Sequence, residues 1–275
     1  MGTRAPLATK TPSGPYAAID LGTSRIRATL PSRAVFVDRP SALGGPAHAL
    51  TPDPAAPRGR RPKARPIEHG IVTDAGACTH LTRLTLLEAD PGRELRQVVI
   101  AVPSAASGNQ LNRAVTAVGA AAGRPVRTME APLAAAIGAG IDPSDPRPRL
   151  ILDIGAGIVE AAAIIRGRVH ASRSIQYVPE RPAGHQMPRV PEHVRAQIAT
   201  ALRHMLTDLP PPLRRAARDG GLLLTGGGAC LPSLPGSLTA EMGMTIKIAR
   251  DPARATIRGL AHACNSPEAW RLTRA

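Results

Sequence analysis

Two aspartates stand at matching places in the two halves of this 275-residue chain. Asp20 ends the apolar run 16–20 and opens the sequence Asp-Leu-Gly-Thr, and Asp153 ends the run 150–153 and opens Asp-Ile-Gly-Ala-Gly. A buried strand that ends on a carboxylate and continues into a turn with free backbone N–H groups suits a phosphate chain and its magnesium ion. Two such turns facing each other predict a clamp on phosphates.

The elements that must position these turns follow from the hydrophobic pattern. The sequence predicts strands over 26–30, 34–37, 97–102, 126–129, 150–154, 159–165, 169–174, 221–225 and 245–249. It predicts helices over 77–87 after an N-cap at Asp74, 111–122 before a stop at Gly123, 132–137, 194–209 and 252–263. Strands that alternate with helices indicate an α/β fold.

Composition limits the function classes. The net charge of +15 comes almost wholly from arginine and favours anionic partners. Aromatic side chains are scarce, so the stacking platforms of single-strand binders are missing and nucleic acid is not an expected partner. The three cysteines lack Cys-x-x-Cys spacing, and no apolar run reaches the ~18 residues of a membrane span. We expect a cytoplasmic protein, at most peripheral at the inner face of the membrane.

A third glycine-rich turn, residues 225–228, follows the strand predicted over 221–225. In this order and at these intervals, the three turns resemble the two phosphate loops and the adenosine loop of the actin-like ATPase superfamily. The segments 65–74, 99–103 and 130–140 are similar to those of the MreB family of bacterial actins, and the resemblance covers roughly 16–37, 65–178 and 219–263. It implies an actin-like (ribonuclease H-like) α/β fold of two duplicated lobes with reduced upper subdomains.

The resemblance also divides the chain. We expect a disordered tail over 1–15, a first lobe over 16–145, a second lobe over 146–250, and a closing helix and tail over 251–275 that packs back on the first lobe. Residues 38–65 are rich in Pro, Gly and Ala and would form a reduced subdomain or loop. Residues 179–218 are too few for the family's second upper subdomain, and only one convincing helix is predicted there.

For the cleft, the resemblance implies ATP or ADP with magnesium. Asp20 and Asp153 would face the metal through water. The residues expected to bind nucleotide are Gly22, Thr23, Ser24, Arg25, Gly155, Ala156 and Gly157 at the phosphates, and Gly226, Gly227 and Gly228 under the base and ribose. Arg25, where the family commonly has Asn, either attracts phosphate or fills the site by pairing with one of the two aspartates.

The groups that place the attacking water depart from the family pattern. The family's second Glu at the start of the crossing helix is Ala131 here, and the first Thr after the second phosphate loop is Ile158. Glu130 and Glu160 remain as candidate carboxylates, although Glu130 is one residue out of place and would point about 100° away on a helix. Losing both groups should reduce hydrolysis by orders of magnitude.

Three functions remain open from the sequence. The first is an MreB-like protein of the cell-shape or envelope-growth machinery, with weak or absent ATP hydrolysis, that acts as an interaction module on an intact bacterial actin paralogue or on envelope-growth proteins. The second is an active, filament-forming ATPase whose water is placed by Glu130 or Glu160. The third is a basic adaptor that binds an anionic membrane surface through the arginine-rich stretch 58–65.

Overall fold

The computed structural model describes residues 15–43, 65–178, 190–231 and 234–274. The predictions for the tail over 1–14, for residues 44–64, which include most of the arginine-rich stretch, and for residues 179–189 lie outside these ranges. No helix in the described ranges combines the length and apolar character that crossing a bilayer requires.

Two five-stranded sheets are built in the same way from the two halves of the chain. The first has the order β3-β2-β1-β6-β7 and the second β10-β9-β8-β11-β12. The strands are β1 (Tyr16–Leu21), β2 (Arg25–Leu30), β3 (Val35–Pro40), β6 (Gln97–Val102), β7 (Val126–Glu130), β8 (Arg149–Ile154), β9 (Ile158–Ile165), β10 (Arg168–Gln176), β11 (Leu222–Thr225) and β12 (Ile246–Ile248). In each sheet, three strands that follow one another in the chain pair antiparallel: β1, β2 and β3 in the first sheet, and β8, β9 and β10 in the second. On the other side of β1, β6 and β7 are parallel to it, and on the other side of β8, β11 and β12 are parallel to it.

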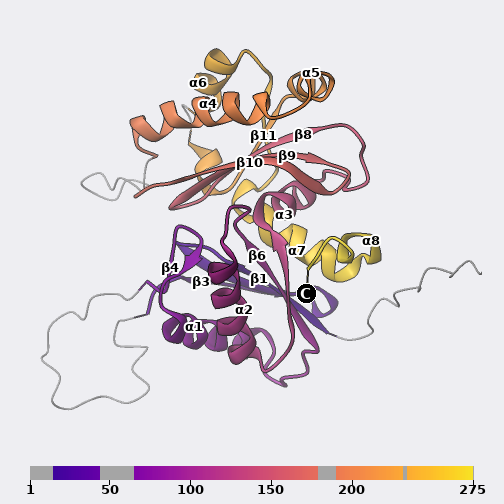
Figure 1. The fold of residues 1–275 in the computed structure, drawn as a ribbon. Helices are drawn as coiled ribbons and strands as arrows, with labels where there is room; N and C mark the ends of the chain where they lie inside the picture. Colours follow the sequence, from indigo (N-terminus) through magenta and orange to yellow (C-terminus); the bar gives the residue numbers. More distant parts are fainter. Residues whose placement is uncertain (1–14, 44–64, 179–189, 232–233, 275) are drawn as a thin grey trace, which may run out of the picture.

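Helices cover the outer faces of both sheets, as Figure 1 shows. On the first sheet these are α1 (Ala75–Ala89) and α2 (Gly108–Ala122), and on the second α4 (Glu192–Thr207), α5 (Pro211–Gly220) and α6 (Leu234–Met242). The predicted N-cap is present, because Asp74 accepts a hydrogen bond from the N–H of Ala77 at 2.9 Å. The predicted stop of α2 is also present, with Gly123 at a φ of 63°.

Two further helices lie between the sheets: α3 (Ala131–Gly138) and α7 (Ala255–Asn265). They cross with backbone against backbone, since a Cβ atom added to Gly138 would lie 1.8 Å from the carbonyl oxygen of Ala255. A Cβ atom added to Gly259 would lie 1.8 Å from the carbonyl oxygen of Ala134. Only glycine permits this approach, and the crossing joins the inner faces of the two sheets.

The C-terminal residues return to the first sheet. The short helix α8 (Pro267–Trp270) places the Trp270 ring 5.1 Å from that of Tyr16. Arg274 then pairs with Thr128 of β7 through two backbone hydrogen bonds of 2.7 and 2.8 Å. The tail therefore adds to the edge of the first sheet beside β7.

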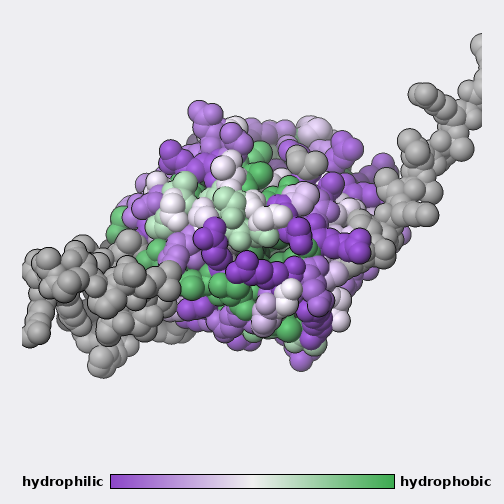
Figure 2. Space-filling model, turned by 90° about the horizontal axis from the view of Figure 1, so that it is seen from below, coloured by the Kyte–Doolittle hydropathy of each residue, from purple (hydrophilic) through white to green (hydrophobic). Residues whose placement is uncertain are grey.

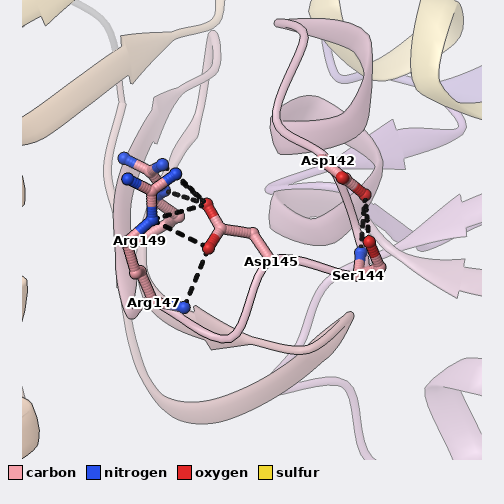
Figure 3. A network of polar contacts seen from close by, with 5 residues as sticks. All are labelled: Asp142, Ser144, Asp145, Arg147 and Arg149. Carbon is pink, nitrogen blue, oxygen red and sulfur yellow. Dashed lines mark hydrogen bonds and ion pairs between the residues drawn. The ribbon is translucent and has the colours of Figure 1, made fainter.

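A network of ion pairs fixes the connection from α3 to β8 (Figure 3). The carboxylate of Asp145 accepts hydrogen bonds from Arg147 at 3.0 Å and from Arg149 at 2.6 Å, which holds its pKa well below the ordinary value. Asp142 accepts from the hydroxyl of Ser144 at 2.7 Å. The link between the halves is thus ordered by its own side chains.

Five of the labelled helices and strands were not predicted from the sequence. They are the two strands of the short hairpin ahead of α1, namely β4 (Ile67–Glu68) and β5 (Ile71–Val72), and the helices α5, α6 and α8. The expectation of a single helix between β10 and β11 was wrong, because a second helix, α5, follows α4. The guanidinium of Arg214 in α5 donates to carbonyl oxygens at the end of α4, at 2.8 and 2.9 Å, and so satisfies groups that the end of a helix leaves unpaired.

The outer surface beneath the first sheet is mixed in character. Figure 2 shows this face from below, with hydrophilic residues around smaller hydrophobic areas. The exposed large hydrophobic side chains are few, namely Phe36, Leu87, Val178 and Ile248 among the described residues. The apolar side chains along one face of α4 are buried against β9 and β10, as in a helix that covers a sheet; they include Val194, Ile198, Leu202 and Met205.

Candidate functional site

The two Asp-Gly turns have the same backbone geometry. In the first, the N–H of Gly22 donates to the carbonyl oxygen of Arg25 at 3.1 Å, and in the second Gly155 donates to Ile158 at 2.8 Å. A Cβ atom on Gly22 would lie 2.7 Å from the Arg25 oxygen, so this turn requires glycine. Each turn follows the central strand of its sheet on the side that faces the other lobe.

Both turns leave backbone donors available. No backbone carbonyl of the described residues accepts from the N–H groups of Thr23, Ser24, Ala156 and Gly157. Successive free N–H groups in a tight turn form a concave site that favours anions. The free N–H groups of both turns can therefore donate hydrogen bonds to phosphate oxygens.

The two turns are also in direct contact across the cleft. A Cβ atom on Gly157 would lie 3.2 Å from the methyl carbon of Thr23 and 3.3 Å from the Nδ1 atom of His69. His69 Nδ1 lies 2.7 Å from the carbonyl oxygen of Gly157 and must be the donor, because a carbonyl only accepts. The N–H of Gly70 donates to the Thr23 hydroxyl at 3.0 Å. The β4–β5 hairpin thus links the first phosphate turn to the second.

We expect the variant His69→Asn to weaken this link. Asparagine tolerates the left-handed backbone of residue 69, where φ is 53°, but its side chain is too short to reach Gly157. Losing one hydrogen bond should lower the free energy of unfolding by about 1 kcal/mol. Amide hydrogen exchange should quicken at both turns. The matched control is His170→Asn on the exposed side of β10, which should change neither quantity.

Behind the first turn, three charged side chains form a row across neighbouring strands. The strand register places Asp20 opposite Arg27 and Arg27 opposite Asp38. Arg27 Nη1 lies 3.2 Å from Asp20 Oδ2, and Arg27 Nε lies 3.3 Å from Asp38 Oδ2. Burial raises the pKa of the Asp20 carboxyl above its ordinary value, and the Arg27 charge opposes that rise.

Arg25 lies beside this row but does not pair with either expected aspartate. Its guanidinium binds the side chain of Asp38 and donates to the Asp38 carbonyl oxygen at 2.9 Å. The alternative in which Arg25 fills the site by pairing with Asp20 or Asp153 was therefore wrong. Side chains alternate along β2, and the hairpin register brings Arg27 opposite Asp20.

In the second lobe, Asp153 is bonded to the strand beside it. The hydroxyl of Thr225 donates to Asp153 Oδ1 at 2.9 Å. Burial raises the pKa of Asp153 to about 6; the Thr225 hydrogen bond opposes this rise, and the nearby Asp20 charge adds to it. The two aspartates are therefore close enough to interact, as the repeated turns predict.

The glycine triplet packs against the end of β8. A Cβ atom on Gly226, where φ is 81°, would lie 2.7 Å from Asp153 Oδ1, and one on Gly228 would lie 2.2 Å from the Ile154 side chain. Nothing lies within 4 Å of a Cβ atom on Gly227. Two of these glycines are thus required for packing, and the third borders open space where a ligand has room.

The two remaining carboxylates of the cleft are both engaged. Glu160 is buried and its Oε1 atom accepts from the N–H of Ser104 in the first lobe at 2.8 Å. Burial raises the pKa of Glu160 to about 8, so this side chain is mainly protonated at neutral pH. Glu130 precedes α3 and lies 3.8 Å from Arg274, and burial raises its pKa as well.

The arrangement fits a phosphate chain better than it fits a divalent metal. The free turn amides suit phosphate oxygens, but Asp20 is already paired with Arg27 and Asp153 with Thr225. No group of three or more His, Cys, Asp or Glu side chains that could hold a metal ion occurs in the described part of the chain. The described residues therefore do not fit a magnesium ion.

Several residues of the site were not found from the sequence. Arg27 and Asp38 were missed although the turn at Gly22 fixes the register of the hairpin, and a residue count along it gives the pairing. His69 and Thr225 reach the site from distant parts of the chain. No local pattern indicates those two contacts.

Two duplicated sheets of this order, two matching Asp-Gly turns between them and a helix crossing the interface define an actin-like protein. The comparisons agree. The family model described as MreB/Mbl protein matches residues 15–188 and 185–271. This chain therefore belongs to the MreB/Mbl family and is a homologue of the bacterial actins of the cell-shape cytoskeleton.

Individual relatives cover nearly the whole chain. The cell shape-determining protein MreB of Escherichia coli K12 is 24% identical over an alignment of 314 positions, gaps included, that covers 88% of this chain and 90% of that protein. The crystal structure of MreB5 of Spiroplasma citri bound to ADP gives a TM-score of 0.74 at 21% identity, covering 90% of this chain and 95% of that one. The structure of the MamK double helical filament gives a TM-score of 0.72 at 14% identity, covering 91% of this chain and 98% of that one. The predicted actin-like fold is confirmed.

Proposed function

We propose that this chain is a member of the MreB cytoskeleton that holds a nucleotide in its cleft without hydrolysing it, and that it acts as an interaction module on an intact actin paralogue in cell-shape or envelope growth. The family supports the cytoskeletal setting. The free amides of the two turns support a nucleotide phosphate chain, and MreB5 of Spiroplasma citri has been crystallised with ADP. This role places the chain in the cytoplasm, at the inner face of the membrane.

One observation carries the absence of hydrolysis. Positions 131 and 158 hold Ala and Ile, and the two nearby carboxylates are already engaged, Glu130 with Arg274 and Glu160 with Ser104. A protonated Glu160 is also a poor base, because its carboxyl group already carries the proton that a general base would have to accept. Neither side chain is arranged to orient an attacking water.

We expect ATP turnover by the purified chain to be at least about 100-fold slower than that of an intact MreB protein assayed beside it, because water placement and charge stabilisation supply most of the rate in phosphoryl transfer. The double variant Ala131→Glu with Ile158→Thr restores both groups and should raise turnover above either single variant. Phosphate release with magnesium present measures turnover by all five proteins: the wild-type chain, the intact MreB protein, the two single variants and the double variant.

Binding and assembly need separate measurements. Calorimetry with ATP, ADP and a non-hydrolysable analogue reports nucleotide binding independently of turnover. Co-sedimentation with an intact MreB paralogue reports assembly, a measurement that the MamK double helical filament among the structural neighbours motivates. Turnover at the rate of the intact protein, abolished by Glu160→Gln, would instead establish an active ATPase.

A further inference from the structure

The guanidinium of Arg27 is largely buried beside Asp20, behind the first Asp-Gly turn. We propose that Arg27 is the resident cation of this cleft, so that a nucleoside polyphosphate binds here without needing a divalent metal. This inference rests on the proposed function, because it concerns the ligand of the same cleft. The new part of the inference is that the bound nucleotide is a polyphosphate without a metal ion.

The position of Arg27 follows from the strand register. Arg27 lies on the middle strand of the hairpin, between Asp20 on one side and Asp38 on the other, at 3.2 and 3.3 Å. Its side chain is 14% exposed, so solvent screens this charge only weakly. The Nε–H group is buried and faces Asp38 Oδ2 at 3.3 Å, without good hydrogen-bond geometry. Its contribution to a ligand is therefore the charge of the guanidinium rather than a hydrogen bond from Nε.

The charge of Arg27 reaches the second lobe as well. It stabilises the ionised form of Asp153, which lies at the end of β8 across the cleft. Asp20 and Asp153 therefore share the charge of Arg27, while Asp38 lies between Arg27 and Arg25. A divalent ion placed among them would have to displace Arg27 from Asp20 and would be repelled by the same guanidinium.

The duplicated half has no equivalent cation. Asp153 on β8 pairs in register with Glu160 on β9, just as Asp20 on β1 pairs with Arg27 on β2. The residue at the Arg27 position of the second lobe is thus acidic. Of these two matched positions, only the one in the first lobe carries a positive charge that can attract phosphates. Arg27 provides it, near the turn that holds the free amides of Thr23 and Ser24.

The test is a nucleotide titration of the full chain by calorimetry, in excess magnesium and in excess EDTA. The dissociation constants of the wild type for ATP should agree within about threefold between the two conditions. Arg27→Leu should bind ATP at least about tenfold more weakly in EDTA, the scale expected for the loss of one favourable charge interaction. Arg27→Lys should retain most of the metal-free binding.

A second readout uses magnesium alone. Magnesium should leave the melting temperature of the wild type unchanged and raise that of Arg27→Leu, because the freed carboxylates become available to the ion. Arg39→Leu is the matched control, since it removes an arginine of the same sheet whose partner is Glu88 on α1. It should bind ATP as the wild type does, with and without magnesium.

Two results would overturn the proposal. One is a wild type that binds ATP in magnesium and loses at least about tenfold in EDTA. The other is a wild type that binds ATP in neither condition, which leaves assembly with an intact paralogue to be judged by co-sedimentation alone. If Arg27→Leu fails to fold, the wild-type titrations and Arg27→Lys decide the question. The first result would overturn only this proposal, because ATP would still bind in magnesium as the proposed function requires, whereas the second result would remove the nucleotide from the proposed function as well.

Discussion

Replacing Gly259 by alanine is expected to prevent the two halves of the chain from packing together. The new Cβ atom would lie 1.8 Å from the carbonyl oxygen of Ala134, far inside the 3.0 Å below which real Cβ contacts are essentially never found. The obstacle is backbone rather than the end of a flexible side chain, so α3 and α7 must move apart and expose buried apolar surface. We expect a loss of more than about 4 kcal/mol, a large part of the stability of an ordinary domain.

Thermal unfolding followed by circular dichroism, together with soluble yield, measures this effect. Gly138→Ala meets the Ala255 carbonyl oxygen at the same 1.8 Å and should behave alike. Gly236→Ala in α6 is the matched control, because nothing lies within 4 Å of its Cβ position and alanine favours a helix by up to about 1 kcal/mol over glycine. A Gly259→Ala protein that melts within a few degrees of the wild type would show that the crossing tolerates separation.

The second large effect concerns pH and Glu160. In the unfolded chain this carboxyl ionises near its ordinary pKa of 4.5, whereas burial keeps it protonated in the folded chain up to about pH 8. Between these values the folded protein binds more protons than the unfolded one, so the free energy of unfolding falls as pH rises. The expected slope is about 1.4 kcal/mol per pH unit from this group.

The variant Glu160→Gln should remove that slope. A glutamine carbonyl oxygen can still accept from the Ser104 N–H, and the neutral amide has no charge to bury beside Asp153 and Glu130. At pH 8.5 we expect the variant to be more stable than the wild type by roughly 2 to 4 kcal/mol, with little difference at pH 4. Urea unfolding across this pH range measures the difference.

A separate pH window keeps this prediction specific. Burial raises the pKa of Asp153 only to about 6, so Asp153 changes the free energy of unfolding only below about pH 6. Between about pH 6 and 8, Glu160 is the group that titrates. Glu160→Gln should therefore still lose stability between pH 4 and 6 but no longer between 6 and 8. Exposed Glu241→Gln serves as the control and should follow the wild type. An unchanged slope between pH 6 and 8 in Glu160→Gln would mean that another group titrates there.

Much of the fold could be predicted because its signals are local. Both Asp-Gly turns, the N-cap at Asp74 and the stop at Gly123 depend on a few adjacent residues, and the structure has all of them. By contrast, α5 buries only Ala217 and is ordered in part by Arg214 at the end of α4. A contact with another helix is not visible in the local sequence, so this helix could not be predicted with the same rules.

The candidate site, like the fold, was predicted only where its features depend on adjacent residues. Its backbone turns were predicted, but the partners of its charges were not, because a shift of two residues along β2 decides whether Arg25 or Arg27 meets Asp20. His69 joins the second turn through a contact with Gly157 that spans 88 residues of chain. The predicted roles of Asp20, Asp153 and the glycine turns in nucleotide binding stay predictions, which the titrations described above address.

The return of the C-terminal residues to the first sheet affects how this protein can fold during its synthesis. The inner face of β1 is covered by α7 and Trp270, and Arg127 on β7 bonds to Thr273, 146 residues further along the chain. While the ribosome makes the second half, this apolar face of the first sheet stays uncovered. Contacts that span so much chain form late and leave such faces open to wrong partners. A nascent chain halted before residue 255 should therefore need a chaperone to stay soluble.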